Sequence, residues 1–369
     1  MKNLRSGALA KLWKTRRDSI IAFAMVLIAY SVIQTMITGG SLSRAMKGQL
    51  VPICVYIVMA VSLNLTVGIL GELSLGHSGF MCVGAFAGVT ASILLTETIP
   101  SEPLRLTVAM VVAAVAAALV GILVGLPVLR LRGDYLAIVT LAFCEIIKVL
   151  FQNFYLGVDT NGLHFGIIKK NFELGEGGRL IIDGPSGIPS GVMSGQRIAT
   201  FGAGVLLVLF TLFVVLNLIN SRHGRAIMAV RDNKIAADSI GISTTRFRLL
   251  AFVISASLAG MAGALYGASQ TVIEAKKYDF NLSILVLVFV VLGGLGNIWG
   301  SILSATLLTL LPELLRGLNT YRMLIYAILL ILLMIFNNSK LKSILGDRLG
   351  ALKGRLTKKE AAQTEGEVA

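Results

Sequence analysis

Charged residues and metal-binding residues are both scarce in this chain. Only 14% of its 369 residues are charged, against about 25% in a typical soluble domain, so an ordinary soluble enzyme is excluded. Its three cysteines and three histidines are far apart, with no second ligand at metal-ligand spacing, and we expect no metal site. These six residues are Cys54, Cys82, Cys144, His77, His164 and His223.

Motifs for catalysis are missing as well. The sequence has no Gly-x-x-x-x-Gly-Lys-Ser/Thr phosphate loop, and it lacks the His-Glu-x-x-His and Gly-x-Ser-x-Gly patterns of hydrolases. An ATPase and an intramembrane enzyme are therefore both disfavoured. We expect a protein that is not an enzyme and that holds no cofactor of its own.

Apolar residues are abundant instead. They make up 56% of the chain, and the mean hydropathy is +0.83. Since a helix needs about 20 apolar residues to cross the hydrocarbon layer, we predict an all-α, polytopic membrane bundle of ten spans. Two of these spans, 74–95 and 282–296, are rich in glycine and are expected to be broken or re-entrant. The ten spans are 19–37, 50–70, 74–95, 106–129, 135–156, 199–219, 247–269, 282–296, 298–312 and 321–336.

The basic residues indicate which loops are cytoplasmic. With the N-terminus inside, ten crossings leave four segments inside that hold 21 of the 33 basic residues and 8 of the 19 acidic ones. Nearly all of the net charge of +14 is then cytoplasmic, as the positive-inside rule expects. The four segments are 1–18, 130–134, 220–248 and 337–369.

This assignment gives the predicted domain organisation. Basic cytoplasmic tails, 1–18 and 337–369, flank a transmembrane domain at 19–336. The first apolar run is longer than a signal-peptide core, and no small-x-small cleavage site follows it, so we predict a retained signal anchor.

Small residues recur at four-residue spacing in two of the spans. Such ridges let helix backbones approach closely, and they indicate either packing within this chain or a seam with a partner subunit. The ridges are Ala113, Ala117, Gly121 and Gly125, and Ser255, Ala259, Gly263 and Gly267.

The segment 220–248 is too polar to cross a membrane. It contains four apolar residues that can share one face of a short helix ending near Gly241. A cytoplasmic amphipathic helix between two spans can lie on the bilayer or bind a soluble partner. The four residues are Ala226, Val230, Ile235 and Ile240.

Five blocks of sequence form a recognisable set. They are 224–267 (GRAIMAVRDNKIAADSIGISTTRFRLLAFVISASLAGMAGALYG), Gly71–Phe80 (GELSLGHSGF), Gly133–Lys148 (GDYLAIVTLAFCEIIK), Gly184–Pro189 (GPSGIP) and Gly293–Gly300 (GGLGNIWG). Together they resemble the permease subunits, of the LivM type, of ABC importers for branched-chain amino acids. The resemblance extends from about residue 50 to 335.

That resemblance implies a transport subunit of the bacterial inner membrane. Its expected partners are a second related permease, two ATP-binding cassette ATPases that bind ATP-Mg, and a periplasmic amino-acid-binding protein. We expect import of leucine, isoleucine or valine by alternating access, driven through a cytoplasmic coupling loop at 220–246. A permease for urea or short amides is the closely related alternative.

The coupling loop of the resembled family reads Glu-Ala-Ala, three residues, Gly, and it docks into the ATPase. Here the pattern is Ile235-Ala236-Ala237, three residues, Gly241, so the acidic side chain of the first position is lost. Small residues allow close docking, and glycine allows a sharp helix exit at positive φ. Three charged residues complete the predicted coupling site: Arg225, Arg231 and Asp232.

The predicted periplasmic loop 157–198 is the longest non-apolar stretch. In the resembled family this side receives substrate from the binding protein, and an Asn/Asp-Gly-Leu element is soon followed by Gly-Ile-Pro. Here Asn161–Leu163 and Gly187–Pro189 are separated by 23 residues. The extra residues, 164–182, are either a docking hairpin or a tolerated insertion.

A few polar residues are predicted at or near membrane depth. Glu145 is about 16 Å into its helix, counted from Asp134, and Lys148 is one turn away from it. Charged groups at this depth face a bundle interior or a wet cavity. They are either a structural ion pair or partners for the two charges of an amino acid. His77 and Ser78 are further candidates for the translocation path, while Glu72 is assigned to a turn between spans.

An ion-driven secondary transporter is the alternative from a different class. It would use Glu145 as a proton or sodium site and would need no ATPase. The loop 224–241 argues against it, and co-purification with ATPase subunits distinguishes the two.

Overall fold

The structure is a computed structural model that describes residues 23–40, 43–131, 133–159, 162–166, 178–193, 196, 198–315, 317 and 321–338. The predicted tail 1–18 and nearly all of the tail 337–369 are outside the described residues. The same holds for 167–177, within the extra segment of the outer loop.

The chain divides into two compact units, Met1–Leu310 and Leu311–Ala369. The first contains the helices and the sheet discussed below. The second contains helix α13.

A helix lies over each of the ten predicted spans. Five of the described helices are long and apolar enough to cross a membrane, namely α2 with its π-helical continuation η1, α3, α4, α7 and α10. The others are shorter or carry more charge, so the ten-span count stays a prediction. The bounds are Phe23–Thr38, α2 Arg44–Asn64, η1 Leu65–Ile69, α3 His77–Leu94, α4 Glu102–Val128, α5 Asp134–Gln152, α7 Phe201–Asn220, α10 Thr244–Gly267, α11 Phe280–Gly293, α12 Ile298–Leu314 and α13 Arg322–Asn338.

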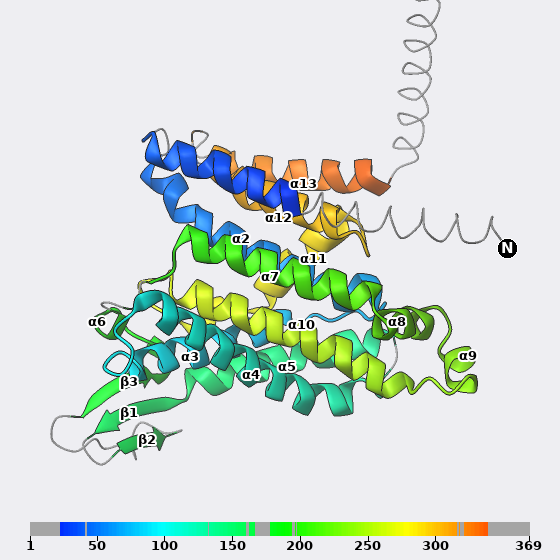
Figure 1. Ribbon diagram of the computed structural model, residues 1–369, viewed down its shortest axis with the longest axis horizontal. Coiled ribbons are helices and arrows are strands. Elements are labelled where there is room, and N and C mark those ends of the chain that lie inside the picture. Colours follow the sequence, from blue (N-terminus) through cyan, green and yellow to red (C-terminus); the bar gives the residue numbers. More distant parts are fainter. Residues whose placement is uncertain are drawn as a thin grey trace, which may run out of the picture. The chain divides into compact units, whose positions relative to one another are not determined.

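Helices α3, α4 and α10 form the core of the first unit and lie side by side (Figure 1). Glycine makes this spacing possible, because backbone occupies the space where a side chain would stand. A β-carbon on Gly84 would be 2.1 Å from the Gly260 carbonyl oxygen, and one on Gly263 would be 2.0 Å from that of Met81. One on Gly121 would be 2.9 Å from the Ala256 β-carbon. The two predicted ridges therefore pack within this chain.

A small sheet corrects the all-α prediction. Strands β1 Tyr155–Asp159, β2 Gly162–Gly166 and β3 Arg179–Asp183 form an antiparallel sheet in the order β2-β1-β3. Helix α5 consequently ends at Gln152 rather than at 156. The sheet is stabilised by pairing between strands up to 28 positions apart, from Tyr155 to Asp183, and no local apolar period announces such pairing.

Short elements connect the sheet to the rest of the outer segment. Gly187 has a φ of +66°, and beyond it Ile188 pairs with Ile273 in the connection between α10 and α11. The short elements are η3 Gly184–Ser186, α6 Ser190–Met193 and η4 Ala275–Lys277.

The polar segment 220–248 contains two helices rather than one. Helix α8 is Arg222–Asp232 and helix α9 is Lys234–Ser239, and both lie at the end of the bundle opposite to the sheet (Figure 1). The break is at Asn233, whose backbone is extended (φ −155°, ψ 106°) and whose Oδ1 accepts a hydrogen bond from the Ala236 amide at 3.0 Å. Asparagine is among the preferred N-cap residues, so this side chain starts α9 in a new direction.

Candidate functional site

Helix α9 presents apolar side chains to solvent. Ile235 is 80% exposed and Ile240 is 75% exposed, whereas the predicted single helix placed both on one face with Val230. Val230 is buried on α8, so the break at Asn233 separates it from the two isoleucines. Ala236 is exposed beside Ile235, and Ala237 is buried below it. The result is a small apolar surface, Ile235, Ala236 and Ile240, on a polar connection.

The end of α9 is fixed by a Schellman motif. Gly241 has a φ of +83° and donates its amide to the Asp238 carbonyl at 3.0 Å, while the Ile242 amide donates to the Ala237 carbonyl at 3.0 Å. This backbone conformation strains any residue with a β-carbon. The glycine predicted as a sharp helix exit therefore holds the orientation of Ile240.

The charged residues of the predicted coupling site point in different directions. Arg225 donates to the Asn220 carbonyl at 3.2 Å, at the junction of α7 and α8. Arg231 pairs with Asp232 at 2.9 Å. Its Nη1 also donates to the Gly68 carbonyl in η1 at 3.3 Å, so it contacts the transmembrane part of the chain.

A second cation holds the same end of the bundle. Arg248 of α10 forms an ion pair with Glu72, and its Nη1 donates to the Leu129 carbonyl at the end of α4 at 2.6 Å. Burial raises the pKa of the Glu72 carboxyl, and the Arg248 guanidinium acts in the opposite direction. Glu72 does lie in a non-helical connection, as predicted. Arg248 therefore joins this connection to α10 and to the end of α4.

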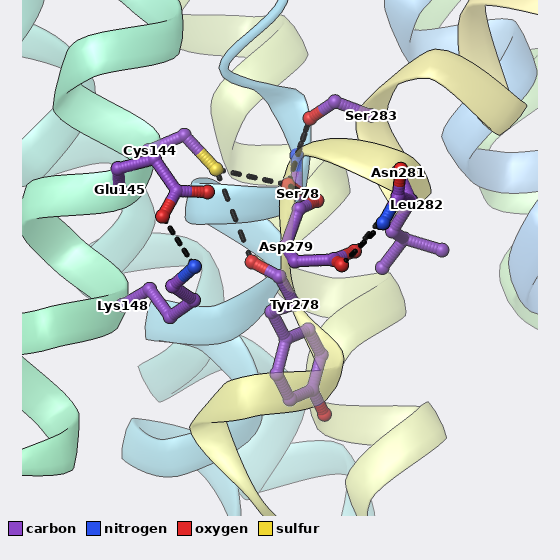
Figure 2. Close-up of polar contacts among 9 residues, drawn as sticks. All are labelled: Ser78, Cys144, Glu145, Lys148, Tyr278, Asp279, Asn281, Leu282 and Ser283. Atoms are coloured by element: carbon purple, nitrogen blue, oxygen red, sulfur yellow. Dashed lines mark hydrogen bonds and ion pairs between the residues drawn. The ribbon is translucent and has the colours of Figure 1, made fainter.

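The first turns of α3 and α11 meet in a polar centre made of Ser78, Cys144, Asp279 and Ser283 (Figure 2). The Ser78 hydroxyl is 2.7 Å from the Ser283 hydroxyl and 3.0 Å from the Cys144 sulfur, and it lies 2.9 Å from the Asp279 carbonyl. Asp279 caps α11 by accepting the Leu282 amide at 3.1 Å. Two helix N-termini, which favour negative charge, therefore converge beside α5.

Glu145 and Lys148 lie next to this centre on α5, where they form the predicted ion pair (Figure 2). Their side chains are 37% and 18% exposed, respectively. Glu145 also borders a pocket of about 700 Å³. The other described residues that line it are Ile146, Val149, Leu150, Asn153 and Phe154.

His77 points away from the polar centre. Its Nε2 lies 2.8 Å from the Ser62 hydroxyl of α2, and the imidazole is buried. The structure thus brings three of the four predicted path residues together, namely Ser78, Glu145 and Lys148, while His77 contacts a different helix.

Two residues of the polar centre, Asp279 and Ser283, were missed by the sequence reasoning. Asp279 stands directly before the apolar run that becomes α11, and an N-cap signal of this kind marks a helix start. Ser283 carries no such signal, because an isolated serine in an apolar span has no local pattern.

The end of the bundle that carries the sheet has its own polar site. Gln196 accepts a hydrogen bond from Ser92 at 2.7 Å and donates one to Thr96 at 2.9 Å. These residues adjoin a pocket of about 410 Å³ whose lining includes Asp159 and Arg179 of the sheet. This places opposite charges on one surface at this end of the bundle.

Comparison with known proteins identifies the relatives of this chain. Residues 45–335 match the family described as "Branched-chain amino acid transport system / permease component". The high-affinity branched-chain amino acid transport system permease protein LivM of Salmonella typhimurium is 35% identical over 330 residues, which is 87% of this chain and 74% of that protein. LivM of Escherichia coli is 37% identical over 318 residues, or 81% and 71% of the two chains.

A more distant relative has a related name. The permease protein LivH of Salmonella typhimurium is 34% identical over 113 residues, covering 30% of this chain and 36% of that protein. No solved structure matches the chain. The resemblance predicted from the five sequence blocks is confirmed.

Proposed function

Because this chain belongs to the branched-chain amino acid transport permease family, we propose that it is the LivM-type permease subunit of an ATP-driven importer. It moves leucine, isoleucine and valine across the bacterial inner membrane by alternating access. Separate ATPase subunits bind ATP-Mg and supply the energy, a second, related permease completes the membrane part, and a periplasmic binding protein delivers the substrate.

The exposed apolar surface of α9 carries this proposal. Burying an isoleucine side chain stabilises a complex by about 1.5–3 kcal/mol, and a short polar connection gains nothing by exposing two of them. An ATPase surface that covers Ile235, Ala236 and Ile240 accounts for that exposure. Small Ala236 and Ala237 let the partner approach the helix closely, and Gly241 fixes its exit.

The membrane topology that this function needs is ten spans with both termini cytoplasmic. Contacts within the first unit support it, because residues from loops assigned to one side meet each other. On the inner side Glu72 pairs with Arg248, and Arg248 bonds to the end of α4. On the outer side Thr96 bonds to Gln196.

The polar centre and the Glu145–Lys148 pair are the proposed translocation path. A branched-chain amino acid carries one positive and one negative charge and an apolar side chain. The pair offers a partner for each charge, and the two helix N-termini favour a carboxylate. Charged groups at this depth are costly against lipid, so the exposed side of Glu145 faces water, substrate or the second permease.

Reconstitution tests the proposed function. The chain is co-expressed with its ATPase subunits and companion permease, purified, and placed in vesicles with the binding protein inside or outside. Uptake of leucine that requires ATP and the binding protein supports the proposal. Uptake by this chain alone, driven by a proton or sodium gradient without ATP, would falsify it in favour of a secondary transporter.

A further inference from the structure

The segment Gly71–Gly76 joins η1 to α3 without helical structure, and we call it the strap. It begins at the end of the bundle that carries α8 and α9, and it leads directly to His77 and Ser78 at the start of α3. Both ends of the strap are held by contacts to other helices. The strap is therefore a physical connection between the ATPase side and the polar centre.

Arg231 of α8 holds the inner end. Its side chain lies directly over Gly71, where a β-carbon would stand only 2.7 Å from the Arg231 γ-carbon. Gly71 has a φ of +80°, so glycine is needed for the backbone and for the approach of Arg231 alike. Together with the bond from Arg231 to the Gly68 carbonyl, this contact spans the junction of η1 and the strap.

The outer end of the strap is held by α5. The Leu75 amide donates to the Thr140 hydroxyl at 3.0 Å. Gly76 lies so close to α5 that a β-carbon there would be 2.3 Å from the Thr140 carbonyl oxygen. Cys144 of the polar centre is one turn further along α5. A shift of the strap would therefore move both α3, which carries Ser78, and α5, which carries Cys144.

Apolar packing links α8 to the start of the strap as well. Ile227 of α8 is fully buried in a cluster with Leu65, Ile69 and Leu70. The first two of these belong to the π-helix η1, and π-helical turns inside longer helices are associated with functional sites. The cluster lets α8 and η1 move together, while Arg231 is the polar contact that extends this coupling past Leu70 into the strap.

We propose that Arg231 is a positioning residue that makes the strap follow α8, so that ATPase movement at α9 reaches the polar centre. This inference rests on the proposed function. The ATPase-facing side of the segment is then α9, whereas Arg231 acts inside its own chain. Glu72 and Arg248 hold the strap to α4 and α10 at the same end.

The first test replaces Arg231 by alanine in the complete reconstituted transporter. ATPase subunits should still co-purify, because Arg231 is not the apolar docking surface. The number of leucine molecules imported per ATP hydrolysed should fall by about fivefold, within the usual range of coupling between sites. Arg222→Ala is the matched control, since it removes an exposed arginine from the same helix, and its ratio should equal that of the unchanged protein.

The second test restores the connection covalently. An ideal β-carbon on Gly71 lies 3.8 Å from the Arg231 β-carbon, which is the usual separation in a disulfide. The double variant Gly71→Cys/Arg231→Cys should be uncoupled when reduced with dithiothreitol and coupled again after oxidation with copper phenanthroline. The single variants control for strain at Gly71 and for oxidation of the native cysteines, which are buried.

The outcomes separate the inference from the proposed function. If the unchanged complex imports leucine with ATP but Arg231→Ala keeps the same import ratio, the inference is wrong while the proposed function stands. An oxidised double variant that stays uncoupled, with the cross-link verified by mass spectrometry, also overturns it. If the unchanged chain binds no ATPase, the proposed function itself fails.

Discussion

The hydroxyl groups of Ser78 and Ser283 lie 2.7 Å apart, although 205 positions separate the two residues. Ser78 lies in the first turn of α3 and Ser283 in the first turn of α11, so this contact joins two helix starts inside the bundle. Both residues are buried. A hydrogen bond in such a site is worth most when every partner is present, because an unpaired buried polar group is expensive.

Removing the Ser78 hydroxyl should therefore affect transport. In Ser78→Ala the Ser283 hydroxyl and the Asp279 carbonyl lose a partner, at a cost of about 1–3 kcal/mol. We expect a lower melting temperature in detergent and reduced leucine uptake. Ser257→Ala is the control, since the hydroxyl of Ser257 donates to the Val253 carbonyl of its own helix. Equal behaviour of the two variants would argue against a role for the polar centre.

The apolar surface of α9 can be tested with charge. Ile235→Asp should weaken ATPase binding roughly 10- to 100-fold, because about 1.5–3 kcal/mol of burial is lost. Ile235→Leu keeps the apolar area and should bind normally. Co-purification of the ATPase from detergent extracts measures the effect. Normal recovery of ATPase with Ile235→Asp would place the docking surface elsewhere.

Gly241 can be compared with Gly133, a second glycine at positive φ. Gly241 and Gly133 have φ values of +83° and +58°, and a β-carbon would meet nothing within 4 Å at either position. Alanine costs about 1–2 kcal/mol of backbone strain at Gly241 and about 1–3 kcal/mol at Gly133, whose ψ of −133° lies outside the left-handed helical region. Only Gly241→Ala should reduce ATPase co-purification, since only Gly241 orients α9. If Gly133→Ala lost ATPase co-purification to the same extent, the effect of Gly241→Ala would reflect general instability of the protein.

A charge swap separates the two interpretations of Glu145 and Lys148. Glu145→Gln should reduce uptake about tenfold with the complex still assembled, if the carboxylate meets the substrate ammonium group. The swap Glu145→Lys/Lys148→Glu restores an ion pair but exchanges the positions of the charges. We expect uptake to stay low in the swap. Recovery of uptake there would make the pair structural.

The Glu72–Arg248 pair should contribute to stability. Glu72→Gln leaves Arg248 buried without its anion, and breaking a buried pair in this way costs about 3–5 kcal/mol. We expect a lower melting temperature and a lower yield of folded protein. The double variant Glu72→Gln/Arg248→Met removes both charges and should recover part of the loss. A full loss in the double variant would mean that the Arg248–Leu129 bond is the important one.

The sequence was most informative where the structure depends on local composition. Each of the ten apolar runs coincides with a described helix. Such runs can be found locally, because the thickness of the hydrocarbon layer fixes how many consecutive apolar residues a crossing needs. Gly241 predicted where α9 ends, because the end of this helix depends on the positive φ of that single residue.

The sequence was least informative where distant residues meet. The sheet requires β1 to pair with β3, and nothing at Tyr155 or Asp183 predicts that register. The break at Asn233 was missed because Ile235 and Ile240 fit an apolar period that the backbone does not follow. Ser283 had no signal at all, since its meaning comes from Ser78 on another helix.

At the end of the bundle that carries the sheet, main-chain hydrogen bonds join the connections between helices. Ile188 and Ile273 exchange both of their backbone bonds, at 2.9 and 3.2 Å, and β1 pairs with a strand on each side. Every residue except proline carries the same backbone donor and acceptor, so these hydrogen bonds depend little on which side chains are present. The surface at this end of the bundle can therefore change in charge and shape while the helices beneath it stay in place.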